Sequence, residues 1–130
     1  MTSITLKGKI FTGNGEGKKF VSLPWVQQQI QQKLGFQPFL GTLNLRLDRA
    51  SLELKKKLEK TDRVEIVPEK GYCKAILIKG KMTGLDCGII IPQVGGYSPD
   101  VLEIVAAVFL RQRLHFSDGS LAAVTVELQR

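Results

Sequence analysis

The chain of 130 residues carries 19 lysine and arginine residues against 12 aspartate and glutamate residues, a net charge of +7. This charge favours an anionic partner such as a nucleotide, a nucleic acid or an acidic surface, and the length and 43% hydrophobic content indicate one globular domain over residues 1–130. No apolar run reaches about 18 residues, and the first residues resemble a strand instead of a signal peptide, so we expect a cytoplasmic protein with no membrane-spanning segment. Two cysteines and one histidine cannot complete a four-ligand zinc site, so we expect no structural zinc.

The first predicted elements flank a glycine-rich segment. Alternating apolar and polar residues predict a half-buried strand over residues 4–11, which leads into residues 13–18. We expect residues 20–22 to form a short extended segment. A helix then opens at residues 23–24 and ends at Gly35, because proline is tolerated in a first turn and glycine favours a helix end.

The clearest alternation of the sequence predicts a strand over residues 41–48. Thr42 and Asn44 face one side of this strand. The residues that face the other side are Leu43, Leu45 and Leu47. A short helix or an irregular turn follows over residues 51–60, and we expect its lysine run, residues 55–57, on the solvated side.

The second half of the chain adds short strands. They are predicted, in chain order, at residues 63–67, 73–79, 82–91, 101–106 and 121–128. The second and third of these form a hairpin centred on Gly80, which would place Cys73 and Cys87 opposite each other as free, packed thiols. The triplet Ile89–Ile91 lacks alternation and is expected to be buried on both faces.

Loops and one short helix connect the last strands. Residues 93–100 form a loop long enough to border a site. The apolar strand at residues 101–106 contains one carboxylate, Glu103, which lies either on an open face or near a ligand hydroxyl. Residues 109–115 look helical, with His115 facing solvent. At least six strands, short helices and no β-α-β rhythm predict a mostly β fold, a closed barrel.

Two segments carry candidate chemistry. In Gly13-Asn14-Gly15-Glu16-Gly17-Lys18, alternate glycines let the backbone N–H groups turn toward one phosphate anion. The segment matches neither the G-x-G-x-x-G dinucleotide pattern nor the P-loop pattern, so a solvated turn is the alternative. Thr42 and Asn44 offer neutral oxygen ligands for Mg²⁺, and the alternative is the solvated face of an edge strand.

A set of short motifs extends over nearly the whole chain. In order, these are Gly13-Asn14-Gly15-Glu16-Gly17-Lys18, Phe20-Val21-Ser22-Leu23-Pro24, Leu34-Gly35-Phe36, Pro38-Phe39, Gly41-Thr42-Leu43-Asn44-Leu45, Leu47-Asp48, Leu102-Glu103-Ile104-Val105-Ala106, Leu110-Arg111 and Asp118-Gly119. The set resembles the archaeal CTP-dependent riboflavin kinases. This resemblance implies a six-stranded cradle-loop barrel of the RIFT type with short helices. It also implies transfer of the γ-phosphoryl group of CTP to the ribityl 5′-hydroxyl of riboflavin, giving FMN and CDP.

The same resemblance implies roles for individual residues. Those implied to contact the nucleotide are Gly13, Asn14, Gly15, Glu16, Gly17, Lys18, Val108, Phe109, Leu110 and Arg111. Thr42 and Asn44 would hold the Mg²⁺ cofactor, and Glu103 would bind the flavin side and is the candidate general base. Gly95 stands where the family tends to have a threonine that touches the flavin phosphate, so its backbone N–H or Ser98 would have to substitute.

The expected partners are therefore CTP or CDP and riboflavin or FMN, with no nucleic acid, and we expect a monomer. Two alternatives from other classes remain open at this stage. One is a non-catalytic nucleotide- or flavin-binding domain. The other is a basic β-barrel that binds nucleic acid through scattered lysines and arginines, although the chain has few aromatic residues on which bases could stack.

Overall fold

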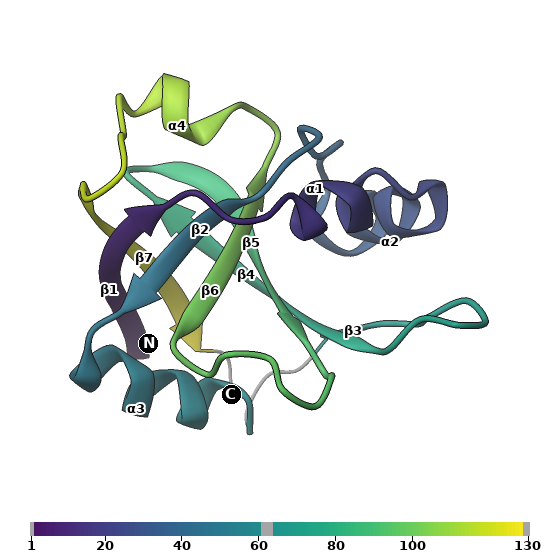
Figure 1. The fold of residues 1–130 in the computed structure, drawn as a ribbon, viewed down its shortest axis with the longest axis horizontal. Coiled ribbons are helices and arrows are strands. Elements are labelled where there is room, and N and C mark those ends of the chain that lie inside the picture. Colours follow the sequence, from purple (N-terminus) through teal and green to yellow (C-terminus); the bar gives the residue numbers. More distant parts are fainter. Residues whose placement is uncertain (1, 61–63, 129–130) are drawn as a thin grey trace.

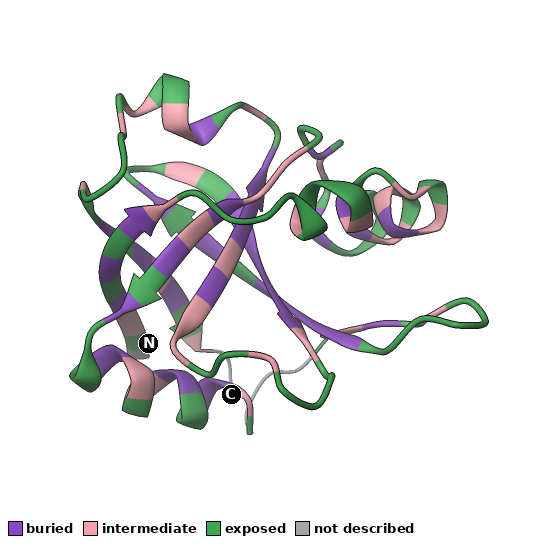
Figure 2. Ribbon diagram, in the orientation of Figure 1, coloured by how far each residue is buried: buried purple, intermediate pink, exposed green. Residues whose placement is uncertain are grey.

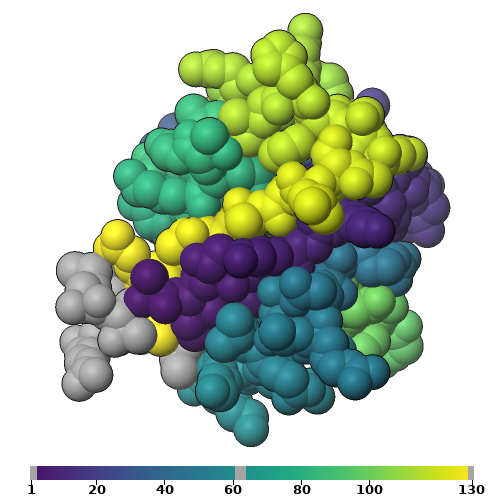
Figure 3. Space-filling model, turned by 90° about the vertical axis from the view of Figure 1, so that its left-hand side faces the viewer, coloured from purple at the N-terminus to yellow at the C-terminus, as the bar shows by residue number. Residues whose placement is uncertain are grey.

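A closed antiparallel β-barrel forms the centre of the computed structural model, which describes residues 2–60 and 64–128 (Figure 1). Its strands are β1 (Thr2–Phe11), β2 (Leu43–Leu47), β4 (Ala75–Met82), β5 (Leu85–Pro92), β6 (Val101–Ala106) and β7 (Leu121–Leu128). They follow one another around the barrel in the order β4, β5, β6, β2, β1, β7, and β7 returns to β4 through the pair Thr125–Lys81. β1 and β7 lie side by side on the face shown in Figure 3. The predicted fold class, a mostly β six-stranded barrel with short helices, is confirmed.

A further strand, β3 (Val64–Ile66), extends the sheet outside the barrel. It pairs with the first half of β4, and β7 reaches β4 nearer its end, at Lys81. The strand predicted at residues 63–67 is confirmed for residues 64–66, and residue 63 lies outside the described part of the chain.

Alternation along the strands places one face of each in the barrel interior. On β2, Leu43, Leu45 and Leu47 are buried, whereas Asn44 is half-buried and Arg46 is exposed. Figure 2 shows the same alternation of buried and exposed positions along β1. For β2, the predicted separation of buried leucines from polar outer residues is therefore correct, although the strand covers Leu43–Leu47 and not the whole of residues 41–48.

A second apolar cluster lies outside the barrel, beneath α2 (Pro24–Leu34). This helix begins at its proline and ends before Gly35, whose φ of +85° suits glycine, as predicted. Val26 of α2 packs in this cluster together with Ile90, while the isoleucines on either side of Ile90 belong to the barrel core. The predicted burial of Ile89–Ile91 on both faces is confirmed.

A short helix, α1 (Glu16–Val21), replaces the extended segment predicted for residues 20–22, which was wrong. The Asn14 side chain accepts a hydrogen bond from the Glu16 N–H (3.1 Å) and so supports the start of the helix. Val21, at its end, is fully buried in the second cluster. Tertiary burial therefore decides the conformation, as is usual for a helix too short to be stable alone.

Two more helices lie at opposite ends of the barrel (Figure 1). α3 (Arg49–Leu58) packs beside β1, and its N-cap Asp48 accepts a hydrogen bond from the Ser51 N–H (2.7 Å). α4 (Leu110–Arg113) is a shorter helix than the one predicted over residues 109–115. None of the described helices is long and apolar enough to cross a membrane.

The lysine run of α3 is only partly solvated, which corrects the prediction for its first member. Lys56 and Lys57 are exposed, but Lys55 is only 3% exposed. Its ammonium group turns inward and donates to the carbonyls of Pro99 (2.8 Å) and Val101 (3.2 Å). The helical period alone could not reveal these acceptors, because they lie more than forty residues away in the chain.

The β4–β5 hairpin turns at Thr83 and Gly84, not at the predicted Gly80. Both turn residues have positive φ (+49° and +79°), as a two-residue hairpin turn requires. Gly80 pairs with Cys87 inside the ladder, and a Cβ there would lie 3.1 Å from a β7 carbonyl oxygen, so close approach of β7 explains this glycine. Cys73 precedes β4 and is exposed, so the two thiols are free but not opposite each other, and only Cys87 is packed.

Candidate active site

The glycine-rich segment contacts the start of β2, although about thirty residues separate them in sequence. A Cβ at Gly13 would lie under 3.0 Å from the Asn44 side chain, and a Cβ at Gly17 would lie under 3.0 Å from the Thr42 hydroxyl. Only glycine allows this close approach. The two segments that carry the candidate chemistry therefore lie against each other at the barrel surface.

Glu103 completes a cluster of oxygen atoms with Thr42 and Asn44. Glu103 on β6 pairs with Asn44 on β2 in the sheet register, so both side chains emerge on the same outer face. The Thr42 hydroxyl lies 3.3 Å from Glu103 Oε1 and 3.5 Å from Asn44 Oδ1. The sequence left open whether Glu103 faces solvent or a ligand, and the structure places it half-buried against Gly17.

This cluster offers the kinds of oxygen ligand that a hard cation prefers. It brings together one hydroxyl, one amide oxygen and one carboxylate, all of them ligands that Mg²⁺ accepts. Within residues 2–60 and 64–128, no group of three or more histidine, cysteine, aspartate or glutamate side chains could hold a metal ion. A cation at this cluster would thus depend on oxygens from a bound substrate for most of its ligand charge.

Tyr97, which the sequence interpretation missed, is bonded directly to the cluster. Its hydroxyl donates a 2.6 Å hydrogen bond to Glu103 Oε2. Burial and this bond to the carboxylate raise the pKa of Tyr97, so the phenol stays protonated and remains a donor. The available signal in the sequence was a tyrosine in the site-bordering loop, six residues before the carboxylate.

Thr42 separates two cavities of different character. The larger has a volume of about 420 Å³ and an apolar, partly aromatic wall. Its lining includes Phe20, Tyr72, Ile90, Pro92 and Val94, with Gly17, Thr42, Tyr97 and Glu103 at its polar edge. The smaller has a volume of about 50 Å³ and is bounded by Thr42 and by residues 108–111. Thr42 therefore borders both cavities.

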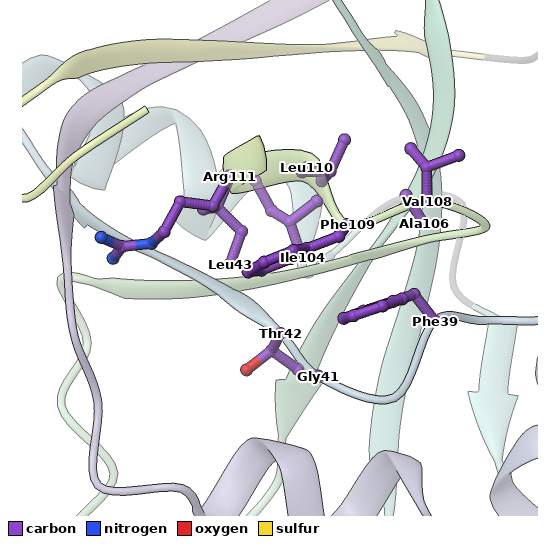
Figure 4. A pocket seen from close by; sticks show the side chains of 10 residues that line it. All are labelled: Phe39, Gly41, Thr42, Leu43, Ile104, Ala106, Val108, Phe109, Leu110 and Arg111. Carbon is purple, nitrogen blue, oxygen red and sulfur yellow. The ribbon is translucent and has the colours of Figure 1, made fainter. Parts of the chain in front are cut away.

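The smaller cavity is lined by aromatic and aliphatic side chains around α4 (Figure 4). The rings of Phe39 and Phe109 stack with centroids 4.9 Å apart and planes 9° apart, and both rings are partly exposed. Val108 is half-buried, and Leu110 is only 4% exposed. Leu110 lines the cavity and is also part of the barrel core.

Arg111 is held at the edge of the glycine-rich segment. Its Nη2 donates to Asp118 Oδ1 (2.9 Å), and the Thr12 hydroxyl donates to the same carboxylate (2.9 Å). These contacts lower the pKa of Asp118, first through Arg111 and then through Thr12. Because Thr12 directly precedes Gly13, this contact fixes a guanidinium beside the candidate phosphate-binding loop.

Two other residues singled out in the sequence lie apart from the cluster. Gly95 lines a different cavity, of about 410 Å³, and Tyr97 borders both that cavity and the larger one next to Glu103. Ser98, its proposed substitute, donates a hydrogen bond to Asp100 (2.7 Å). His115 is exposed, as expected.

Known proteins resemble this chain over most of its length. The family model CTP-dep_RFKase, described as "Domain of unknown function DUF120", matches residues 10–127. A riboflavin kinase of Archaeoglobus fulgidus is 32% identical over 97% of this chain and 56% of its own length. Riboflavin kinases of Ignicoccus hospitalis and Pyrobaculum aerophilum are 35% and 33% identical over 95% and 98% of this chain, and over 71% and 63% of their own lengths.

The chain thus spans a little over half to about seven tenths of the length of these relatives. The match covers the glycine-rich segment from Gly13 onward, the oxygen cluster and both cavities. On the extent of the family match and the level of identity, the chain belongs to the riboflavin kinase family that this model describes.

Proposed function

We propose that this chain is a CTP-dependent riboflavin kinase that transfers the γ-phosphoryl group of CTP to the ribityl 5′-hydroxyl of riboflavin, producing FMN and CDP. The observation that carries the proposal is the position of Thr42, which borders both cavities and whose hydroxyl lies against Gly17 of the glycine-rich segment. Phosphoryl transfer needs a donor and an acceptor brought in line at one point, and Thr42 marks such a point. The names of the relatives and of the family model support both substrates.

On the donor side, residues 13–18 would hold the phosphates of the nucleotide. The first helical bond of α1 joins the Lys19 N–H to the Gly15 carbonyl (3.1 Å), so helix geometry leaves the N–H groups of Gly17 and Lys18 without intrahelical acceptors. The exposed Lys18 adds positive charge. Arg111, held beside Thr12 and Asp118, would add a second positive charge. The partly exposed Phe39–Phe109 stack offers an aromatic surface for the base.

Thr42 and Asn44 would hold Mg²⁺, which would neutralise phosphate charge during transfer. Glu103 Oε1 lies close enough to Thr42 to face the same region. A single carboxylate makes a weak cation site by itself. We therefore expect calorimetry to detect Mg²⁺ binding only when the nucleotide is present, and tight binding to the free protein would contradict this assignment.

On the acceptor side, the cavity of about 420 Å³ would take the flavin ring. Its wall is largely apolar, with the aromatic rings of Phe20 and Tyr72 among its members, which suits an aromatic ligand. Glu103 at the polar edge would accept a hydrogen bond from a ribityl hydroxyl. It is also the best-placed general base, although a loose transition state requires little base assistance.

The decisive experiment incubates the purified chain with riboflavin, Mg²⁺ and each of the four ribonucleoside triphosphates in turn, and separates the flavins chromatographically. We expect FMN with CTP and little with the other three. Equal FMN with ATP would refute the CTP dependence. Absence of FMN with every triphosphate would refute the kinase and leave the non-catalytic binding domain.

A further inference from the structure

A buried lysine on α3 ties down the loop that carries Tyr97. The Lys55 side chain is 4% exposed, and lysine is almost never this buried without partners. Its ammonium donates to the carbonyls of Pro99 (2.8 Å) and Val101 (3.2 Å) and lies 3.9 Å from the Glu59 carboxylate. The first two distances are those of hydrogen bonds, and the third is that of an ion pair.

Burial still lowers the pKa of Lys55, against the opposing effect of Glu59 and Asp100. Desolvation of the ammonium is therefore the larger effect on this group. A methionine or leucine at this helix position would fill the space without that cost. What the charged Lys55 provides, and an apolar residue at this position would not, is the pair of hydrogen bonds to the loop and the start of β6.

Tyr97 connects this anchored loop to the oxygen cluster. Its ring lies 5.9 Å from the Lys55 ammonium, within the range of a cation–π contact. Its hydroxyl donates to Glu103 Oε2 (2.6 Å), and Glu103 Oε1 faces Thr42. One continuous series of contacts therefore runs from α3 through the loop to the carboxylate.

Lys55 is one of several groups that fix the loop: the Leu47 N–H donates to the Asp100 carbonyl (2.7 Å), and Arg46 pairs with the Asp100 carboxylate (3.0 Å). Residues 93–100 include Gly95 and Gly96, and glycine loses more conformational entropy on ordering than any other residue. A Cβ at either glycine would meet no other atom within 4 Å, so packing does not restrain the loop at these positions. Fixing both carbonyls that flank Asp100 restricts the loop directly after Tyr97.

We infer that Lys55 and Tyr97 are positioning residues for the flavin site: Lys55 fixes the 93–100 loop, and through it the Tyr97 hydroxyl holds the Glu103 carboxylate in the orientation that receives the flavin. This inference rests on the proposed function. Neither side chain needs to touch the reacting atoms. Their contribution is to flavin affinity, because a carboxylate already oriented binds its partner without further loss of side-chain entropy.

The test uses three single variants and one double variant. Tyr97→Phe removes only the hydroxyl, and Lys55→Met removes the charge while keeping the length of the side chain. Lys56→Met is the matched control, because Lys56 is the next residue on the same helix, is exposed, and pairs with Glu53 of that helix (3.2 Å). Riboflavin affinity is measured by quenching of flavin fluorescence without nucleotide, and steady-state assays give kcat and KM for each substrate.

We expect Tyr97→Phe and Lys55→Met each to raise the Kd and KM for riboflavin about tenfold, the factor for one hydrogen bond to a charged group. The KM for CTP should stay within about twofold of the wild-type value, and Lys56→Met should match the wild type. The Kd for riboflavin of the double variant should be no higher than that of Tyr97→Phe alone, because the two residues act through one series of contacts.

Three results would overturn the inference. They are a Kd for riboflavin in Tyr97→Phe within twofold of the wild-type value, an equal rise of the KM for riboflavin and the KM for CTP in Lys55→Met, or fully additive losses of riboflavin affinity in the double variant. If Lys55→Met does not fold, Tyr97→Phe decides. A wild type that binds riboflavin but makes no FMN refutes the proposed function while the binding comparison still tests the inference. A wild type that binds no riboflavin refutes both.

Discussion

Replacing Gly17 by alanine would test the central contact of the site. A Cβ there would lie under 3.0 Å from Thr42 Oγ1 and Glu103 Oε1, and ordinary contact begins at 3.4 Å. Both oxygens must then move by about 1 Å, a misplacement that can cost about 10²-fold in rate. Stability should change little, because alanine in a helix gains up to about 1 kcal/mol over glycine and offsets an off-rotamer cost of similar size.

The assay compares FMN formation with the melting temperature for Gly17→Ala and for Gly8→Ala. At Gly8, a Cβ would lie under 3.0 Å from the Arg46 carbonyl oxygen, and backbone in a sheet cannot yield as a side chain can. Gly8→Ala should therefore lose about 1–3 kcal/mol of stability. Activity of Gly17→Ala within threefold of wild type, with unchanged stability, would refute the assigned contact.

Three further variants or measurements follow from the same structure. Asn44→Ala should reduce kcat by about 10²-fold at nearly unchanged stability, since the side chain lies outside the core and would hold the metal. The adjacent Leu45→Ala should instead lower the free energy of unfolding by about 2–5 kcal/mol, because this leucine is fully buried. At pH 8, a thiol reagent should modify one cysteine per folded chain, the exposed Cys73, because burial raises the pKa of Cys87 to about 12.

These measurements have clear contrary outcomes. Unchanged turnover in Asn44→Ala would remove this residue from the metal site, and urea unfolding of Leu45→Ala within 1 kcal/mol of wild type would contradict its burial. Two thiols reacting at the same rate in the folded protein would show that the second cysteine is accessible. In denaturant both thiols should react, which serves as the control.

Local patterns were sufficient for most of the barrel. The two-residue alternation of β2 correctly separated the buried leucines from Asn44, because strand geometry sends successive side chains to opposite faces. The limits of α2 followed from Pro24 and Gly35, whose backbone preferences act within one turn of the helix. The glycine-rich segment and Thr42 were also identifiable as candidates from residue types alone.

Where the interpretation was wrong, a distant part of the chain was responsible. Gly80 suggested a turn, but it allows β7 to approach β4, and β7 lies about forty residues later. Lys55 had the spacing of a solvated residue, yet its acceptors are the carbonyls of Pro99, in the loop before β6, and of Val101, the first residue of β6. Such roles depend on which segments the barrel brings together, and a local pattern contains no information on that pairing.

The sequence by itself determined the alternation, the helix limits and the residue types able to bind phosphate and a hard cation, because these depend on neighbours within a few positions. Tertiary structure alone decided that Gly17, Thr42 and Glu103 meet and that Thr42 borders two cavities. It also decided that Tyr97 donates to the Glu103 carboxylate and that Lys55 donates to the carbonyls of Pro99 and Val101. The physical reason is closure of the barrel, which fixes the register between β2 and β6 and so sets contacts between residues some sixty positions apart.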